Sequence, residues 1–341
     1  MDAPASGLLT DLLKQVSRSF YLTMRVLPAA IRPQISVAYL LARATDTLAD
    51  TQIVPLAERL QALQALRDRI LGGSTAPLNF AALAQQQDSP AEWSLLQRVE
   101  EPVSLLEAFS AEDQQRVREV LSIITAGQQM DLTRFADSSS ERIVSLNSDD
   151  ELDDYTYSVA GCVGEFWTKM CRAHLFFDAP LDDEFLLANG VRFGKGLQLV
   201  NILRDLPRDL RQGRCYLPGE RLWALGLTPL DLLQPESGQK LRPLYDAYLD
   251  QAEEHLAAGW SYTNALPRAG KRVRLACAWP LLIGIRTVDK LRANNVLAPE
   301  LHVKIKRSEV RKIIMRTVLC HPWPWAWARL FPRRGRGNLP A

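Results

Sequence analysis

Residues 39–50 read YLLARATDTLAD and residues 198–209 read QLVNILRDLPRD. Each stretch carries two aspartates spaced four residues apart, which are Asp46 with Asp50 and Asp205 with Asp209. At about 100° per residue, this spacing places both side chains of a pair on one face of an α-helix. Like charges at this spacing repel each other by roughly a few tenths of a kcal/mol. The pairs therefore predict a neutralising cation, and Mg²⁺ is the hard ion that a few carboxylates and substrate phosphates hold.

A solvated helix face is the alternative explanation for such a pair, so the flanking residues matter. The first stretch is too apolar for an exposed helix, with Tyr39, Leu40 and Leu41 before the aspartates. In the second stretch, polar residues follow one another at offsets of three, four and four, at Gln198, Asn201, Asp205 and Asp209. Leucine, valine and isoleucine fill most of the other positions. A helix that is apolar around a polar stripe is typical of a buried helix that lines a polar cavity.

The composition describes a globular chain, because 47% of its 341 residues are hydrophobic and 23% are charged. The net charge of +2 hides an asymmetry, since ten Lys or Arg and one acid, Glu309, lie from His302 onward. We expect one all-α domain over residues 1–319 and a basic, Trp/Arg-rich tail over residues 320–341. The apolar run at 275–285 is interrupted by a proline and is too short to span a bilayer.

The cysteines and histidines limit the kinds of site that the chain can form. Five cysteines show no paired spacing, which favours reduced thiols and a cytoplasmic location. Four scattered histidines make a zinc site an unlikely interpretation. No signal peptide is apparent at the start of the sequence.

Apolar residues recur at helical spacing through nearly the whole chain. The pattern predicts helices over residues 8–16, 33–50, 56–71, 79–87, 93–106, 111–135, 152–176, 182–206, 241–266, 271–291 and 308–319. Residues 138–150 are predicted to be a loop, residues 213–218 break the pattern, and residues 303–305 are the one candidate strand. The prediction is a single all-α bundle.

Five motifs together resemble those of the squalene/phytoene synthase family. In chain order they are Ser17–Phe20, Tyr39–Asp50, Tyr155–Gly164, Gln198–Asp209 and Gly213–Pro218. Their order and separations match that family over roughly residues 15–295. The resemblance implies a single-domain isoprenoid-synthase-type helical bundle with a central cavity. It also implies an Mg²⁺-dependent prenyltransferase that joins two prenyl diphosphates head to head.

The resemblance assigns roles to individual residues. Mg²⁺ ligands are expected at Asp46, Asp50, Asp205 and Asp209, with Gln198 and Asn201 as polar neighbours. Diphosphate contacts are expected at Arg18, Ser19, Arg43, Arg204 and Arg214; a structural ion pair is the alternative for any one arginine. Tyr155 matches the tyrosine assigned to proton removal or cation stabilisation, and Phe20 and Tyr39 match aromatic cavity residues. The small-residue run from Val159 to Gly164 has two compatible interpretations, passage of a long isoprenoid or close helix packing.

The chain departs from the family pattern within both aspartate motifs. Many members carry an additional acid before the last aspartate, and Ala49 and Arg208 occupy those positions here. Pro207 lies between Asp205 and Asp209 and favours a kink, because proline removes a helix hydrogen bond. This predicts that Asp209 lies beyond the end of its helix.

The sequence leaves several products open. The segment Val303–Arg307 resembles a basic segment near the NADPH site of squalene synthases, which favours squalene formation from farnesyl diphosphate with NADPH held by Lys304, Lys306 and Arg307. The alternative is a surface cluster or part of the basic tail. The competing activities are dehydrosqualene, presqualene diphosphate or phytoene synthesis. A non-enzymatic membrane adaptor predicts that motif residues are lost, and the principal ones are present.

The tail beyond residue 319 lies outside the resemblance. It carries Trp323, Trp325 and Trp327 among arginines, a composition typical of an interfacial membrane contact. The alternative is a disordered tail or one packed back on the domain. We expect a monomer with a peripheral membrane contact through this tail and no nucleic-acid partner.

Overall fold

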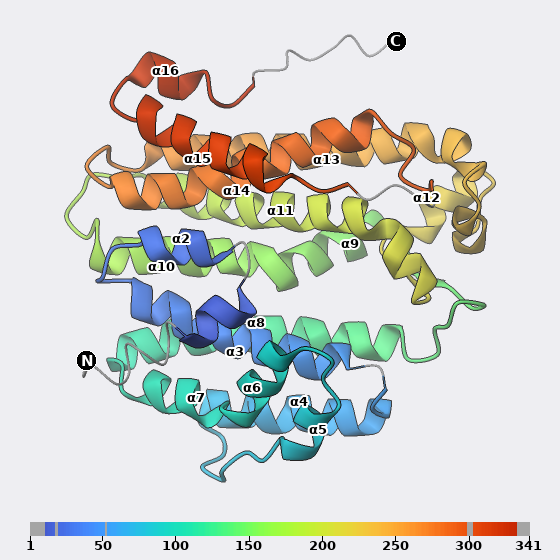
Figure 1. Ribbon diagram of the computed structural model, residues 1–341, viewed down its shortest axis with the longest axis horizontal. Helices are drawn as coiled ribbons and strands as arrows, with labels where there is room; N and C mark the ends of the chain where they lie inside the picture. Colours follow the sequence, from blue (N-terminus) through green and yellow to red (C-terminus); the bar gives the residue numbers. More distant parts are fainter. Residues whose placement is uncertain (1–10, 18–19, 52, 299–302, 333–341) are drawn as a thin grey trace.

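The computed structural model describes residues 11–17, 20–51, 53–298 and 303–332 (Figure 1). Residues 11–16 are helical. The elements that follow are α2 (Phe20–Val26), α3 (Arg32–Asp50), α4 (Leu56–Leu71), α5 (Ala81–Gln85), α6 (Pro90–Gln97), α7 (Glu100–Glu107), α8 (Ala111–Arg134), β1 (Val144–Ser145), α9 (Asp149–Thr156), η1 (Tyr157–Gly161), α10 (Cys162–His174), α11 (Asp183–Arg211), β2 (Arg214–Cys215), α12 (Gly219–Ala224), η2 (Pro229–Leu233), α13 (Ser237–Ala265), α14 (Lys271–Arg292), α15 (Arg307–Cys320) and α16 (Pro324–Ala328). The predicted all-α bundle is confirmed.

Local sequence signals set the ends of several helices. Asp182 begins α11, because its carboxylate accepts a hydrogen bond of 2.9 Å from the backbone N–H of Phe185. Gly72 ends α4 in the left-handed conformation, with φ of +81°, which glycine adopts without a steric penalty. Pro33 lies in the first turn of α3, where the missing N–H costs nothing.

The hydrophobic core forms two large clusters. The first joins α3, α4, α8 and α10, and Leu41, Leu66 and Met170 belong to it. The second joins α11, α13 and α14, and Leu203 and Leu281 belong to it. Figure 1 shows the first group in the lower part of the molecule and the second in the upper part, with α10 of the first group packed against α11 of the second. The two aspartate pairs lie near the C-terminal ends of α3 and α11, so each cluster supports one pair.

Helix α11 approaches η1 and α10 more closely than side chains allow. A Cβ on Gly164 would lie 1.8 Å from the carbonyl oxygen of Gly190, and a Cβ on Gly194 would lie 2.0 Å from that of Ala160. No side chain fits at such distances, so glycine is required where the backbones touch. The close-packing interpretation of the run from Val159 to Gly164 is therefore confirmed for Ala160 and Gly164.

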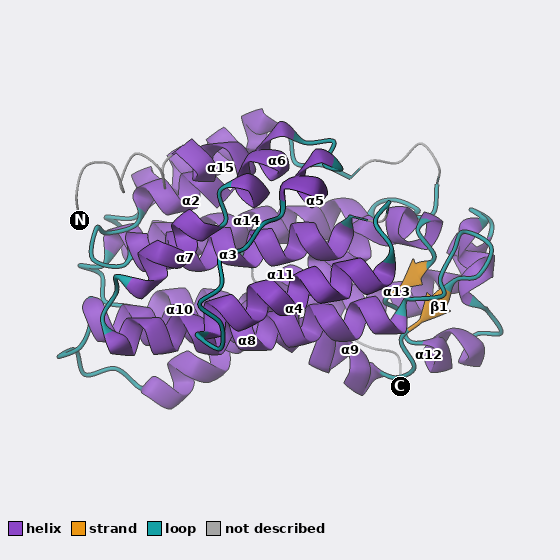
Figure 2. Ribbon diagram, turned by 90° about the horizontal axis from the view of Figure 1, so that it is seen from below, coloured by secondary structure: helices purple, strands orange, loops and turns teal. Residues whose placement is uncertain are grey.

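The structure differs from the sequence prediction at several points. Two turn residues split the helix predicted over 93–106 into α6 and α7, and the π-helical turn η1 interrupts the helix predicted over 152–176. The loop predicted over 138–150 contains β1, which pairs in parallel with β2 at one end of the molecule (Figure 2). Each strand is only two residues long, too short for an alternating pattern. The candidate strand at 303–305 was wrong, because this segment is neither strand nor helix.

Candidate active site

Asp46 of the first pair is held by an arginine of its own helix, and α6 holds that arginine in turn. The Arg43 guanidinium lies 2.6 Å from the Asp46 carboxylate and also pairs with Glu92 of α6. Burial, and then the neighbouring charge of Asp50, raise the pKa of Asp46 to about 6. Asp50 itself is exposed at the end of α3, with 62% of its side chain accessible. The pair therefore combines one carboxylate tied to an arginine with one that faces solvent.

The second aspartate pair takes its counter-charges from its own helix. Arg204 donates two hydrogen bonds to Asp205, of 2.9 and 2.6 Å, in the forked geometry that also suits phosphate oxygens. Arg208 lies 3.4 Å from Asp209. Only 12% of the Asp209 side chain is accessible, and burial raises its pKa to about 6. Arg208, which replaces a family acid, therefore offsets charge at the second pair.

The prediction that Asp209 lies beyond the end of its helix was wrong. Helix α11 continues through Pro207 to Arg211. Proline lacks the N–H that would bond the carbonyl four residues earlier, which is that of Leu203. The buried hydroxyl of Tyr245, on α13, donates to this carbonyl at 2.9 Å. The freed acceptor is thus satisfied from a neighbouring helix, and Asp209 stays on a continuous helix.

Arg214 connects the surroundings of the two pairs. Its guanidinium lies 3.7 Å from Asp50 and 3.6 Å from Asp131 of α8. Its charge also lowers the pKa of Asp209, although burial has the larger and opposite effect. Gly213 precedes it with φ of +80°, and a Cβ there would lie 2.5 Å from the backbone nitrogen of Ser139. A glycine is therefore needed to turn the chain from α11 into the strand that carries Arg214.

Asp131 and Tyr216 belong to the site and were not predicted. The Tyr216 hydroxyl donates to Asp131 at 3.3 Å, and burial raises the pKa of Asp131 to about 6. Tyr216 lies within the motif Gly213–Pro218, which was identified from the sequence, but no role was assigned to this tyrosine. Asp131 has no acidic partner at helical spacing toward either neighbouring turn, so the spacing rule that found the other aspartates missed it.

Tyr155 lies against this cluster at the end of α9. Its ring stacks on Tyr216 with 4.6 Å between centroids and an interplanar angle of 27°. Burial, followed by Tyr216 and Asp131, raises the pKa of Tyr155 well above its ordinary value. The phenol therefore stays protonated at neutral pH. The π-helical turn η1 begins two residues later, and such turns are frequent at functional sites.

The remaining predicted residues fall into two groups. Gln198 and Asn201 are half-buried on α11, Val159 is half-buried in η1, and the Tyr39 hydroxyl donates to the carbonyl of Val16 at 3.4 Å. Arg18 and Ser19 lie outside the described residues, and for Phe20 only its place at the start of α2 is described.

The basic segment lies at the start of α15. Lys304, Lys306 and Arg307 are exposed, and within the described ranges no hydrogen bond or ion pair joins their side chains to the aspartates. Lys290 of α14 holds the segment by donating to the carbonyl of Lys304 at 3.0 Å and pairing with Glu309 at 2.9 Å. The structure therefore places the three cations together without connecting them to the aspartate site.

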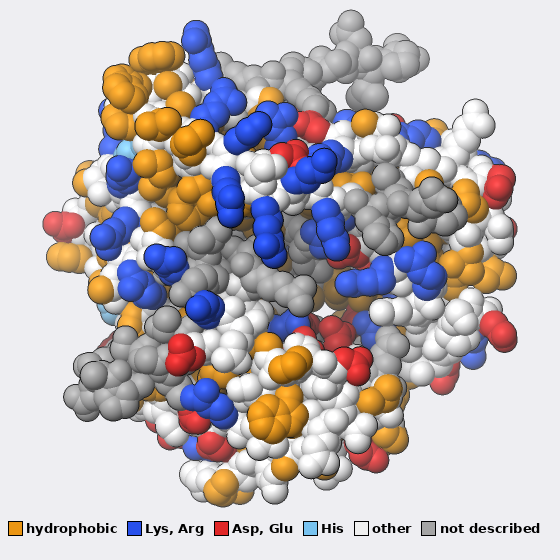
Figure 3. Space-filling model, in the orientation of Figure 1, with side chains coloured by type: hydrophobic (Ala, Val, Ile, Leu, Met, Phe, Trp, Pro, Cys, Tyr) orange, Lys and Arg blue, Asp and Glu red, His pale blue; other side chains and the backbone are white. Residues whose placement is uncertain are grey.

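The two aspartate pairs are the candidate Mg²⁺ ligands, each offering two carboxylates. Across the part of the chain that the structure describes, three or more Asp, Glu, His or Cys side chains nowhere converge as a metal-binding group. Mg²⁺ uses one or two carboxylates and completes its shell with water and substrate phosphates. Figure 3 shows acidic side chains in a hollow between the two parts of the molecule, with Lys and Arg beside them.

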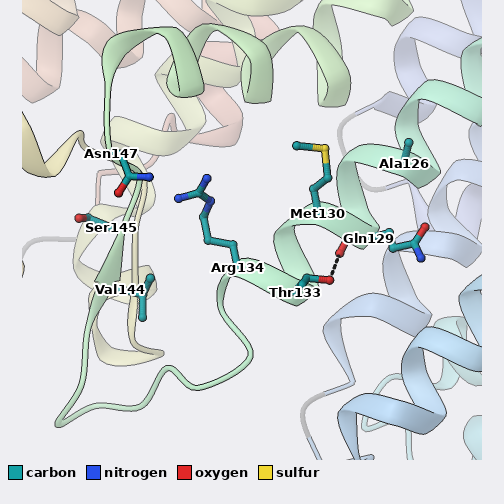
Figure 4. Close-up of a pocket in the computed structure, with 8 residues that line it drawn as sticks. All are labelled: Ala126, Gln129, Met130, Thr133, Arg134, Val144, Ser145 and Asn147. Carbon is teal, nitrogen blue, oxygen red and sulfur yellow. Dashed lines mark hydrogen bonds between the residues drawn. The ribbon is translucent and has the colours of Figure 1, made fainter.

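A separate groove lies on the outer side of α8. It has a volume of about 760 Å³ and is lined by Ala126, Gln129, Met130, Thr133, Arg134, Val144, Ser145 and Asn147 (Figure 4). Within this groove, the Thr133 hydroxyl donates a hydrogen bond of 2.9 Å to the backbone carbonyl of Gln129. None of the predicted site residues lines this groove. The candidate site is therefore the aspartate cluster between the two parts of the molecule.

Known proteins match both the sequence and the fold. A presqualene diphosphate synthase of Rhodopseudomonas palustris is 28% identical over 306 residues, which are 87% of this chain and 92% of the relative. A bifunctional lycopene cyclase/phytoene synthase of Blakeslea trispora is 32% identical over 217 residues. That match covers 62% of this chain and 32% of the relative, so the chain spans about a third of the bifunctional protein.

The structural comparison agrees with the sequence comparison. A structure of TcSQS with a ligand has a TM-score of 0.75 at 21% identity, covering 92% of this chain and 86% of the other. At that identity the likeness shows a shared fold. The sequence model of the squalene/phytoene synthase family matches residues 13–309, which include all four aspartates and Tyr155. The chain therefore belongs to the squalene/phytoene synthase family.

Proposed function

We propose that this protein joins two farnesyl diphosphates head to head through presqualene diphosphate and then reduces the intermediate to squalene with NADPH. One observation carries the first half of the proposal. Arg214 lies 3.7 Å from Asp50 of the first pair, and its charge also acts on Asp209 of the second, which supports a single site for both pairs. Two diphosphate leaving groups need two such positions.

The aspartates are the residues that would hold Mg²⁺. Asp46 with Asp50 and Asp205 with Asp209 each offer two carboxylates on one helix face. When bound, Mg²⁺ neutralises the charge that develops on a departing diphosphate. Arg43, Arg204 and Arg214 already lie beside these carboxylates and supply guanidinium groups for phosphate oxygens. In this proposal they orient the two diphosphates toward the aspartates.

Tyr155 is proposed to act on the carbocation that remains after diphosphate leaves. Its raised pKa keeps the phenol neutral, so the hydroxyl does not act as a base by first losing its proton to water. Its ring and that of Tyr216 form an aromatic surface beside the carboxylate of Asp131. Aromatic faces attract cations, and a nearby carboxylate strengthens that effect. This arrangement supports cation stabilisation, and the carboxylate of Asp131 is proposed to accept the released proton.

The reductive step rests on the exposed cations at the start of α15. Lys304, Lys306 and Arg307 offer positive charge to the phosphates of NADPH, and Lys290 holds their backbone. The second candidate function ends at presqualene diphosphate. It is favoured by the relative from Rhodopseudomonas palustris, which matches 87% of this chain.

Product analysis distinguishes these functions. Purified protein is incubated with Mg²⁺ and either farnesyl or geranylgeranyl diphosphate, with and without NADPH, and the lipids are identified by mass spectrometry. Squalene formed from farnesyl diphosphate only when NADPH is present supports the proposal. Presqualene diphosphate as the end product at saturating NADPH supports the second candidate. Dehydrosqualene or phytoene would contradict both.

A second experiment tests the basic segment in a protein that forms squalene. The Lys304→Ala/Arg307→Ala variant should keep the first condensation and accumulate presqualene diphosphate or dehydrosqualene while squalene falls. High NADPH should partly restore squalene, since the defect is in cofactor binding. An unchanged product ratio at low NADPH would show that these residues do not bind the cofactor.

A further inference from the structure

Large apolar side chains gather on the surface where α15 ends and α16 begins. Thirteen large hydrophobic residues are exposed across the described residues, and five of them lie within residues 315–325. These five are Met315, Val318, Leu319, Trp323 and Trp325. We call them the α15–α16 apolar patch. Apolar side chains scattered singly need no explanation, whereas such a concentration marks an interaction surface.

The patch is built into the fold, because the opposite side of the same segment is anchored. The Trp279 indole donates to the buried Thr317 hydroxyl at 2.9 Å, which fixes the inner face of α15. Trp327 stacks on Trp260 with 5.2 Å between centroids and donates to Asn264 at 2.8 Å. With these contacts in place, Trp323 and Trp325 point away from the bundle. The tail predicted from sequence is thus divided, with Trp327 packed inward and the other two tryptophans turned outward.

Positive charge surrounds the patch. Residues 307–332 carry one acid, Glu309, which is already paired with Lys290. Five cations accompany it, at Arg307, Arg311, Lys312, Arg316 and Arg329. The Arg329 guanidinium lies 5.7 Å from the centre of the Trp325 ring. Figure 3 shows hydrophobic side chains with Lys and Arg beside them over the region of α15 and α16.

We infer that the α15–α16 apolar patch is a docking surface for an anionic lipid bilayer. Tryptophan suits the interface between headgroups and acyl chains, because its ring is apolar and its N–H is polar. Lysine and arginine near the membrane are attracted to anionic headgroups. Along the described chain, no helix has the length and apolar character needed to cross a membrane. Three of the five patch residues lie on α15, so the surface extends beyond the tail that was predicted from the sequence.

Vesicle binding tests this inference independently of catalysis. The full chain is mixed with vesicles of phosphatidylcholine alone or of phosphatidylcholine with phosphatidylglycerol, and bound protein is measured by flotation. The Trp323→Ser/Trp325→Ser variant should bind the anionic vesicles about tenfold more weakly. Trp223→Ser is the matched control, because Trp223 on α12 and Trp325 are both 64% exposed. It should bind as the unmodified protein does.

A second variant tests how much positive charge contributes to vesicle binding. Arg311→Gln/Lys312→Gln/Arg316→Gln should weaken binding to anionic vesicles, and added salt should weaken the unmodified protein in the same way. Failure to bind any vesicle, or equal loss in the Trp223→Ser control, would overturn the inference. Light scattering provides the other decisive result. If the unmodified protein is a dimer that the Trp323→Ser/Trp325→Ser variant dissociates, the patch is a contact between two copies of the chain.

Discussion

The two aspartate pairs have the same spacing but different surroundings. Asp205 and Asp209 take their arginines from their own helix, at Arg204 and Arg208. In the first pair, Arg43 of the same helix holds Asp46 and is itself paired with Glu92 of α6, while Arg214 on β2 lies 3.7 Å from Asp50. Both pairs thus have an arginine on their own helix, and the first pair also has close charged contacts with α6 and β2 that form only in the assembled fold. Equal spacing therefore does not imply equal dependence on the rest of the molecule.

The largest expected effect comes from removing one charge from either pair. Asp46→Asn and Asp205→Asn should each lower kcat/KM with farnesyl diphosphate by at least about 10²-fold, as for loss of a principal electrostatic contact in the transition state. Both should fold, because less like-charge repulsion remains. Asp178→Asn, at an exposed loop position, is the control. If only Asp205→Asn lost activity, the first pair would be a structural ion pair with Arg43 and Glu92.

Tyr155 stacks on Tyr216 beside Asp131, so under the proposed function its hydroxyl should matter to chemistry more than to binding. We expect Tyr155→Phe to lower kcat by about tenfold to a hundredfold with little change in KM. Tyr157→Phe is a matched control, since that hydroxyl donates to Glu165 at 3.2 Å on the side of the first core cluster. A raised KM with normal kcat would make Tyr155 a binding residue.

The hydrogen bond from Tyr245 to the carbonyl that Pro207 leaves free supports the helix of the second pair, so its removal should lower the free energy of unfolding. Tyr245→Phe leaves the buried carbonyl of Leu203 without its donor, which should cost about 1–3 kcal/mol in the free energy of unfolding. Pro207→Ala restores the helix N–H, so Tyr245→Phe should cost less in that background. Chemical denaturation of the four proteins measures this coupling. Additive effects would show that the hydroxyl does not compensate for the proline.

The smallest expected effect is a pH dependence at Asp131. Its pKa is raised to about 6, so the folded protein bears a cost for this charge above pH about 6 that disappears as the pH falls. Asp131→Asn removes the titration. The midpoint of thermal unfolding of the variant, relative to the unmodified protein, should therefore be higher at pH 8 than at pH 5, by about 1–3 °C in EDTA. A relative midpoint that does not change with pH would contradict the raised pKa.

The comparison also explains what the sequence could and could not predict. Helical periodicity and the i,i+4 spacing identified α3, α11 and both pairs, because these signals are local. Tyr245 lies 42 residues from the carbonyl it satisfies, so the continuation of α11 through Pro207 was not visible in the sequence. Asp131 belongs to the candidate site because it contacts Arg214 and Tyr216, which are distant from it in sequence. Contacts made only by the assembled bundle account for what was missed.

The backbone contact of α11 with η1 and α10 has a consequence for how the product range can change. Where Gly164 meets Gly190 and Gly194 meets Ala160, there is no room for even one added methyl group. The helix that follows Tyr155 and the helix that carries Asp205 therefore move as one body, and mutation cannot widen the space between them by small steps. A longer prenyl chain has to be accommodated on the walls formed by other helices. The same contact would hold the proposed catalytic groups Tyr155 and Asp205 in register with each other.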